Sequence, residues 1–180
     1  KVSITTNGTI VNDYIIDVLE EYDVKITVSM DAINKEISNL VRPGIDVEML
    51  IDNIEKLLSS NIIRDNLSVR TTVSKFNINN LIDILVFCEH MGVRKLKINS
   101  VNNFGRAKKT DVTPDFCSFM NKLDEIIDYC RNNISKVKVI LPIERYLQVK
   151  NRECTLGNQS IYVDSFGNVY PCAFSEGKLC

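Results

Sequence analysis

Two cysteines near the end of the chain have a spacing that suits metal chemistry. Cys154 is followed by 12 residues, Gly167, four residues and Cys172. A turn at Gly167 would fold the chain back and bring the two thiolates together, and paired thiolates bind zinc or iron–sulfur clusters. Two cysteines do not complete a four-ligand site, so we expect further ligands, with Cys180 as a third. The alternative is a pair of buried structural cysteines beside a hairpin.

A second set of polar residues follows short runs of β-branched residues. Its members lie at the carboxyl ends of these runs and carry amide, hydroxyl, carboxylate and guanidinium groups: Asn7, Ser29, Asp31, Arg70 and Asn99. Such groups hydrogen-bond small ligands when they converge. The alternative is the ordinary polarity found where strands turn into loops.

Periodicity predicts the elements that would position these residues. The predicted strands, the first of them buried, are residues 2–6, 24–29, 67–74, 93–99 and 137–141. Apolar residues at helical spacing predict helices over residues 10–21, 47–58, 79–91 and 115–132. We expect Gly92 to end the third helix, and Thr113 with Pro114 to begin the fourth.

This alternation of strand and helix predicts parallel strands joined by right-handed crossovers, hence an α/β sheet or barrel. The carboxyl ends of the strands form the working face of such folds. The alternation stops after about Leu141, and the residues around Gly167 predict a β-hairpin. We therefore expect a βα domain over residues 1–141 and the start of a smaller domain over residues 142–180.

Composition restricts the class of protein. The formal net charge is −1, from 22 basic and 23 acidic residues, which favours neither a nucleic-acid partner nor a membrane surface. The sequence contains no apolar run of the roughly 20 residues that cross a bilayer, and no signal peptide opens it. Irregular spacing of the six cysteines argues against a disulfide framework. We expect a cytoplasmic location.

The cysteine-bearing segment resembles a known domain. Residues 154–172 are similar to the opening of the SPASM (or shorter twitch) auxiliary-cluster domain of radical S-adenosylmethionine (SAM) enzymes, whose pattern is Cys, 9 to 15 residues, Gly, four residues, Cys. Residues 5–9, 28–32, 72–77 and 92–99 resemble, in that order, the ends of the third to sixth strands of the same family's partial barrel. The resemblance implies an incomplete parallel (βα) barrel followed by a SPASM or twitch hairpin.

One defining motif of that family is absent. The Cys-x3-Cys-x2-Cys loop that binds the catalytic [4Fe–4S] cluster does not occur in these 180 residues. We expect it to precede Lys1 in a longer protein, so that the chain by itself is inactive. With the earlier strands missing, residues 2–6 would form an open edge that invites dimerisation.

The resemblance implies a radical SAM enzyme in which a reduced [4Fe–4S] cluster and SAM generate a 5'-deoxyadenosyl radical. It implies a peptide or protein substrate, as in peptide or sulfatase maturases, and a reductant such as flavodoxin or ferredoxin. The alternatives are a radical SAM enzyme of small-molecule cofactor biosynthesis and a non-catalytic zinc-binding module.

The resemblance also suggests roles for the polar strand ends. Ser29 corresponds to the family's ribose-binding serine, and Asp31 would accept from a ribose hydroxyl or line the substrate pocket. Arg70 would pair with the methionyl carboxylate, while Asn7 and Asn99 would meet adenine or ribose edges. Cys154, Cys172 and Cys180 would ligate an auxiliary [4Fe–4S] cluster, and Cys88 is expected to be a packed core thiol.

Overall fold

The computed structural model describes residues 2–101, 110–142, 161–164 and 166–171. The chain divides into two compact units, Lys1–Pro142 and Ile143–Cys180. Cys154, Cys172 and Cys180 lie outside the described residues.

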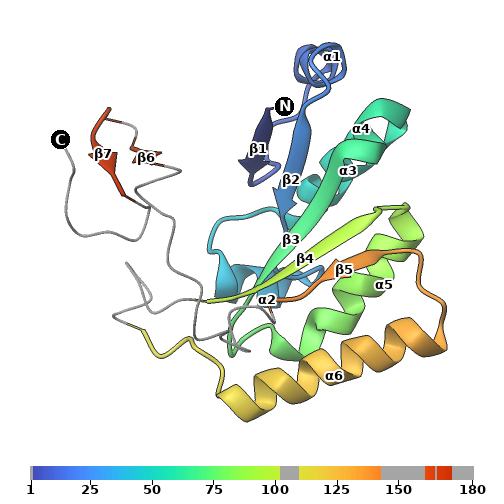
Figure 1. Cartoon of the computed structure of the whole chain (residues 1–180), viewed down its shortest axis with the longest axis vertical. Coiled ribbons are helices and arrows are strands. Elements are labelled where there is room, and N and C mark those ends of the chain that lie inside the picture. The colour runs from blue at the N-terminus through green and yellow to red at the C-terminus, as the bar shows by residue number, and fades with distance from the viewer. Residues whose placement is uncertain (1, 102–109, 143–160, 165, 172–180) are drawn as a thin grey trace. The chain divides into compact units, whose positions relative to one another are not determined.

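The first unit is built on a five-stranded sheet in which every pair of neighbours is parallel (Figure 1). Its strands follow one another in the order β1 (Ser3–Thr6), β2 (Lys25–Ser29), β3 (Leu67–Val73), β4 (Lys95–Ser100) and β5 (Lys138–Ile140). Since all strands run the same way, their carboxyl ends lie along one edge. The predicted α/β fold with a partial parallel barrel is confirmed.

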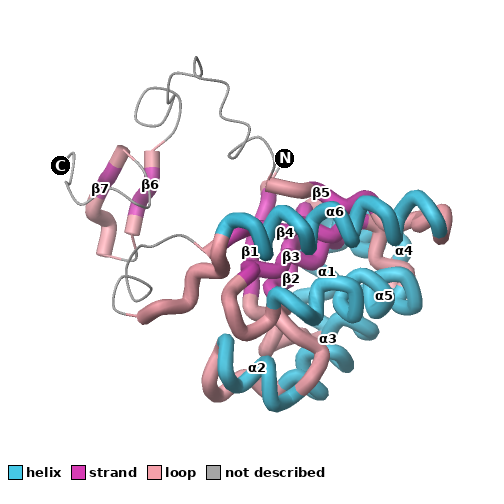
Figure 2. The backbone as a smooth tube through the Cα atoms, turned by 90° about the horizontal axis from the view of Figure 1, so that it is seen from below, coloured by secondary structure: helices cyan, strands magenta, loops and turns pink. Residues whose placement is uncertain are grey.

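Helices connect the strands and lie on one side of the sheet (Figure 2). They are α1 (Asp13–Glu21), α2 (Lys35–Val41), α3 (Val47–Ser59), α4 (Asn61–Asn66), the short 3-10 helix η1 (Ile78–Asn80), α5 (Leu81–Met91) and α6 (Phe116–Asn132). This placement follows from the sequential strand order, because right-handed crossovers between successive neighbours put every helix on the same face. Within the described ranges, no helix is long and apolar enough to cross a membrane.

The sheet has one apolar and one polar face. On the face packed against the helices lie Val28, Leu67, Val69, Leu96 and Ile98, all at most 1% exposed. Successive side chains of a strand point to opposite faces. The intervening residues therefore form the other face, and they are polar: Thr27 and Ser29 on β2, Ser68 and Arg70 on β3, and Lys95, Lys97 and Asn99 on β4.

Three helices begin at side-chain N-caps that could not be predicted from the sequence or were predicted at another residue. Neither α2 nor α4 was predicted, because each has fewer than eight residues and shows little periodicity; Asn34 Oδ1 caps α2 and Ser60 Oγ caps α4. Helix α6 begins at Phe116, one residue after the start of the predicted range, 115–132, and the expected cap at Thr113 was wrong. Asp115 is its N-cap, and its Oδ1 accepts from the Ser118 amide at 2.9 Å. The predicted left-handed cap at Gly92 is confirmed, with φ 73°.

Strand β1 lies at the edge of the sheet and pairs only with β2 among the described residues. The prediction that its residues are buried was wrong, since Val2 is 59% and Ile4 38% exposed. An edge strand is covered on at most one lateral side, which accounts for the difference.

The second unit contains the predicted hairpin, of β6 (Tyr162–Val163) and β7 (Val169–Tyr170). Asp164 organises its turn: Oδ1 accepts from the amides of Phe166 and Asn168, each at 2.9 Å, and Oδ2 accepts from Asn168 Nδ2 at 2.7 Å. These hydrogen bonds lower the pKa of Asp164, and the bond from the Asn168 side chain has the largest effect. The hairpin ends at Tyr170, two residues before Cys172 in the sequence.

Gly8 provides a test of how the end of β1 packs. Its φ is +71°, and a Cβ there would lie 2.6 Å from Leu50 Cδ1 and 2.9 Å from Val28 Cγ1. Gly8→Ala should lower the free energy of unfolding by about 2–4 kcal/mol, through backbone strain and overpacking together. Gly44→Ala is the matched control, because Gly44 has φ +86° but open space around it, and should cost only about 1 kcal/mol. Equal losses in urea unfolding of the two variants would contradict this packing.

Candidate functional site

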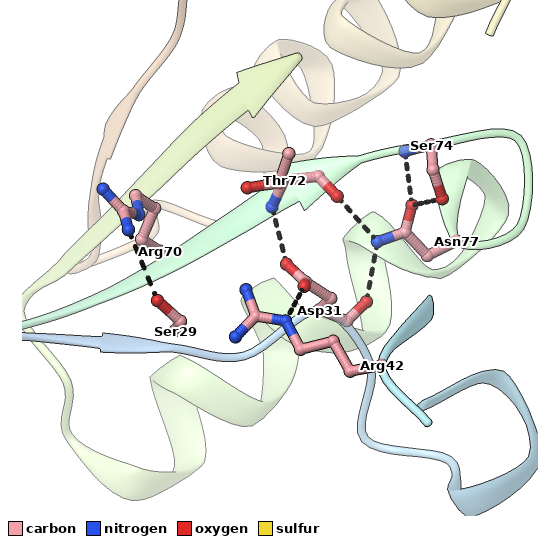
Figure 3. Close-up of polar contacts among 7 residues, drawn as sticks. All are labelled: Ser29, Asp31, Arg42, Arg70, Thr72, Ser74 and Asn77. Atoms are coloured by element: carbon pink, nitrogen blue, oxygen red, sulfur yellow. Dashed lines mark hydrogen bonds and ion pairs between the residues drawn. The ribbon is translucent and has the colours of Figure 1, made fainter. Parts of the chain in front are cut away.

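Two predicted site residues meet on the polar face of the sheet. Ser29 and Arg70 are register partners on β2 and β3, and Arg70 Nη2 donates to Ser29 Oγ at 3.4 Å (Figure 3). Arg70 Nε is buried and has no hydrogen-bond partner among the described residues. A guanidinium has five N–H donors, so most of the donor capacity of Arg70 is not used by the residues that the structure describes.

Asp31 is engaged by the protein itself (Figure 3). Its side chain is 4% exposed; Oδ1 accepts from the Thr72 amide at 2.7 Å, and Oδ2 pairs with Arg42 Nε at 2.5 Å. A buried carboxylate is stable only when it is paired and hydrogen-bonded, and both conditions hold here. Asp31 therefore ties the loop after β2 to the end of β3 and to the C-cap of α2.

Asn77, which the sequence reading did not select as a site residue, completes this connection. It is 0% exposed, and its Nδ2 donates to the carbonyls of Asp31 at 2.9 Å and Thr72 at 3.1 Å. Its Oδ1 accepts from the amide of Ser74 at 2.7 Å and from the hydroxyl of Ser74 at 3.0 Å. One amide side chain thus fixes the carboxyl ends of two strands. An asparagine three residues after a serine that ends a strand is the signal that could have found it.

A second group of residues that was not predicted from the sequence lies in the middle of the strands: Lys97, Thr27 and Ser68. Lys97 on β4 donates from Nζ to Thr27 Oγ1 on β2 at 3.0 Å, so its side chain spans β3. Thr27 Oγ1 is 3.0 Å from Ser68 Oγ. Burial lowers the pKa of Lys97, and the positive charges of Arg70, Lys95 and Lys25 lower it further. The alternation Lys-Leu-Lys-Ile-Asn of residues 95–99 could have revealed these lysines on the polar face.

A cavity lies at the carboxyl ends of β2, β3 and β4. It has a volume of about 390 Å³, and Asp31, Arg42, Thr72, Ser74, Phe76 and Val101 are among the residues that line it. This volume lies in the range of small-ligand sites, about 300–1,000 Å³. A larger cavity, of about 470 Å³, lies between the loops before β4 and β5, at the opposite strand ends. We assign the site to the smaller one because the polar network converges there.

The other predicted residues do not join this network. Asn7 Oδ1 accepts from the Thr9 amide at 3.3 Å and the Thr9 hydroxyl at 3.0 Å, within its own exposed turn. Asn99 is the register partner of Thr72 and belongs to the polar face.

The described cysteines Cys88, Cys117 and Cys130 are all free. Within the described ranges, no three His, Cys, Asp or Glu residues are grouped as metal ligands would be. Cys88 is a core thiol, 0% exposed.

The model of the radical SAM superfamily matches residues 1–88 of this chain, just under half of its 180 residues. Among curated proteins, it is 28% identical to the antilisterial bacteriocin subtilosin biosynthesis protein AlbA of Bacillus subtilis over 99% of the chain and 40% of AlbA. It is 22% identical to the probable GTP 3',8-cyclase of Methanocaldococcus jannaschii over 99% of the chain and 60% of that protein. The chain thus spans between two fifths and three fifths of these relatives.

A solved structure confirms the architecture. Streptococcus suis SuiB bound to the precursor peptide SuiA superposes with a TM-score of 0.74, over 94% of this chain and 42% of SuiB. The sequences are 12% identical, so this likeness shows the fold alone.

Asn77→Ala should destabilise the chain by about 2–4 kcal/mol, because it leaves the buried partners of four hydrogen bonds unsatisfied. Asn80→Ala removes the same amide from an exposed position, where Nδ2 contacts Asp83 at 3.1 Å, and should cost less than about 1 kcal/mol. Urea unfolding measures both. A loss for Asn77→Ala as small as that of Asn80→Ala would show that the strand ends do not depend on Asn77.

Cys88 should resist alkylation. Burial, and then the charge of Glu89, raise the pKa of its thiol to about 12, so almost no thiolate forms at pH 8. Iodoacetamide at pH 8 should modify exposed Cys117 and leave Cys88 unmodified in the native protein, as measured by peptide mass spectrometry. Equal labelling of the two cysteines would refute the buried position of Cys88.

Proposed function

We propose that this chain is the later part of a radical SAM enzyme that modifies a peptide. The observation that carries the proposal is the pair formed by Ser29 and Arg70, in a superfamily named for its use of SAM. Together they offer a hydroxyl and a guanidinium whose Nε has no partner among the described residues. Each lies two residues before a residue that lines the cavity, Asp31 and Thr72.

The residues present fit the carboxylate of a bound SAM molecule. A guanidinium recognises a carboxylate with parallel N–H donors, and the Ser29 hydroxyl can donate one more. The Thr72 and Phe76 side of the cavity would receive the nucleoside. Asp31 would act indirectly, because both of its carboxylate oxygens bind the protein.

When bound, the cofactors of the superfamily, SAM and a reduced [4Fe–4S] cluster, would supply the radical chemistry that removes a hydrogen atom from the substrate. The chain's own residues would orient SAM through its carboxylate and keep water from the reacting centre. A one-electron donor such as flavodoxin or ferredoxin would be the redox partner.

Cys154 and Cys172, with Cys180, would ligate an auxiliary [4Fe–4S] cluster. The support is their spacing and the position of the described hairpin, whose last strand ends two residues before Cys172. Residues 142–180 would then form the beginning of a separate auxiliary-cluster domain.

The proposed substrate class rests on relatives that act on or bind peptides. AlbA is named for the biosynthesis of a bacteriocin, and SuiB was solved with its precursor peptide. The match to a probable GTP 3',8-cyclase supports the second candidate, a small-molecule reaction, but at lower sequence identity.

Arg70→Gln in the full-length protein that contains this chain should weaken SAM binding about 10- to 100-fold, because a charged hydrogen bond to carboxylate contributes about 1.5–3 kcal/mol. Ser29→Ala should weaken it less. Equilibrium binding of SAM, without reductant, measures the effect independently of turnover, and formation of 5'-deoxyadenosine measures activity.

Arg94→Gln is the matched control, because this arginine forms a surface ion pair with Asp65 and both side chains are more than half exposed. It should leave SAM binding unchanged. Wild-type affinity in Arg70→Gln would contradict the assignment, and absence of 5'-deoxyadenosine formation by the reconstituted wild type would contradict the proposed function.

A further inference from the structure

The polar face of the sheet carries positive charge that the described residues do not neutralise. Register and alternation place Lys25, Arg70, Lys95, Lys97 and Lys138 on this face. No strand residue on it is acidic, and within the described ranges none of these five forms an ion pair. The acidic residue nearest in sequence to the strand ends, Asp31, is already paired with Arg42.

Lys97 is the centre of this charge. Arg70 is its register partner on β3, and the positive charges of Arg70, Lys95 and Lys25 each lower the pKa of Lys97. Like charges held together cost free energy in the absence of a counter-charge. An anion bound among them would remove that cost.

The hydrogen bonds on this face show the same surplus of donors. An ammonium group has three N–H donors, and Lys97 uses one of them, to Thr27. Thr27 accepts that bond, so its own hydrogen points to a further acceptor such as Ser68, 3.0 Å away. Ser68 in turn reaches the Ile26 carbonyl at 3.4 Å. The hydroxyls therefore orient Lys97, and two of its donors have no partner among the described residues.

We propose that Lys97 binds a carboxylate of the substrate, an Asp or Glu side chain of the peptide, on the polar face of the sheet. The proposal rests on the proposed function, since a peptide substrate offers carboxylates as its anionic groups. It is separate from SAM binding, which uses Ser29 and Arg70. Thr27 and Ser68 are positioning residues that fix where the Lys97 ammonium lies.

The test uses the full-length protein with its clusters and SAM but without reductant. The probes are two pentapeptides with acetylated and amidated ends, Ala-Ala-Glu-Ala-Ala and Ala-Ala-Gln-Ala-Ala, whose dissociation constants are measured by saturation-transfer NMR on the peptide. We expect the glutamate peptide to bind at least about tenfold more tightly, the ratio expected for a charged hydrogen bond. Equal affinities, or no binding of either peptide, would overturn the proposal without any variant.

Variants of the protein test whether Lys97 causes the tighter binding of the glutamate peptide. Lys97→Gln should abolish it, Lys97→Arg should retain most of it, and Lys56→Gln, which removes an exposed cation from α3, should leave it intact. A Lys97→Gln variant that keeps the preference, or that loses SAM affinity instead, would show that the anion is bound elsewhere or belongs to SAM. If wild-type protein fails to bind or cleave SAM but keeps a Lys97-dependent glutamate preference, the proposed function fails and the anion site stands.

Discussion

The structure depends on the in-register parallel pairing of β2, β3 and β4. This register, with the alternation of side chains along each strand, packs apolar residues such as Val28 and Val69 against the helices and leaves Ser29, Arg70 and Lys97 on the other face. A shift of one residue in β3 would bury Arg70 against the helices and expose Val69. The hydrophobic effect therefore fixes the position of the polar groups.

The polar residues on these strands and in the loops that follow them are of two kinds. Asp31 and Asn77 have their hydrogen-bonding atoms satisfied by the protein, and they hold the loops after β2 and β3 together. Arg70 and Lys97 have donors left over. The first kind gives the site its rigidity, and the second gives it the capacity to bind an anion.

Much of the fold could be predicted from the sequence because it rests on strong local patterns. The runs of β-branched residues gave all five strands, and apolar spacing gave the four longer crossover helices. The short helices α2 and α4 were missed because a cap and one or two turns carry little periodicity. The expected burial of β1 was wrong because burial depends on neighbours, which a strand's own residues do not specify.

The site was predictable at its edge but not in its interior. Ser29 and Arg70 could be selected from the sequence because each is a polar residue in or at the end of a β-branched run, and the structure places them in contact. Lys97 and Thr27 become neighbours only through a side chain that spans β3. Asp31 was selected as a possible ligand residue, but the sequence does not show that the Thr72 amide and Arg42 would occupy its carboxylate.

The proposed function requires that the polar face of this sheet bind SAM through its carboxylate at Ser29 and Arg70. The most direct measurement is an anaerobic crystal structure of the full-length protein with SAM. The account predicts the methionyl carboxylate within hydrogen-bonding distance of the Arg70 guanidinium, with Lys97 still bonded to Thr27 and facing the substrate side. A carboxylate bound elsewhere, with no contact to Ser29 or Arg70, would contradict it.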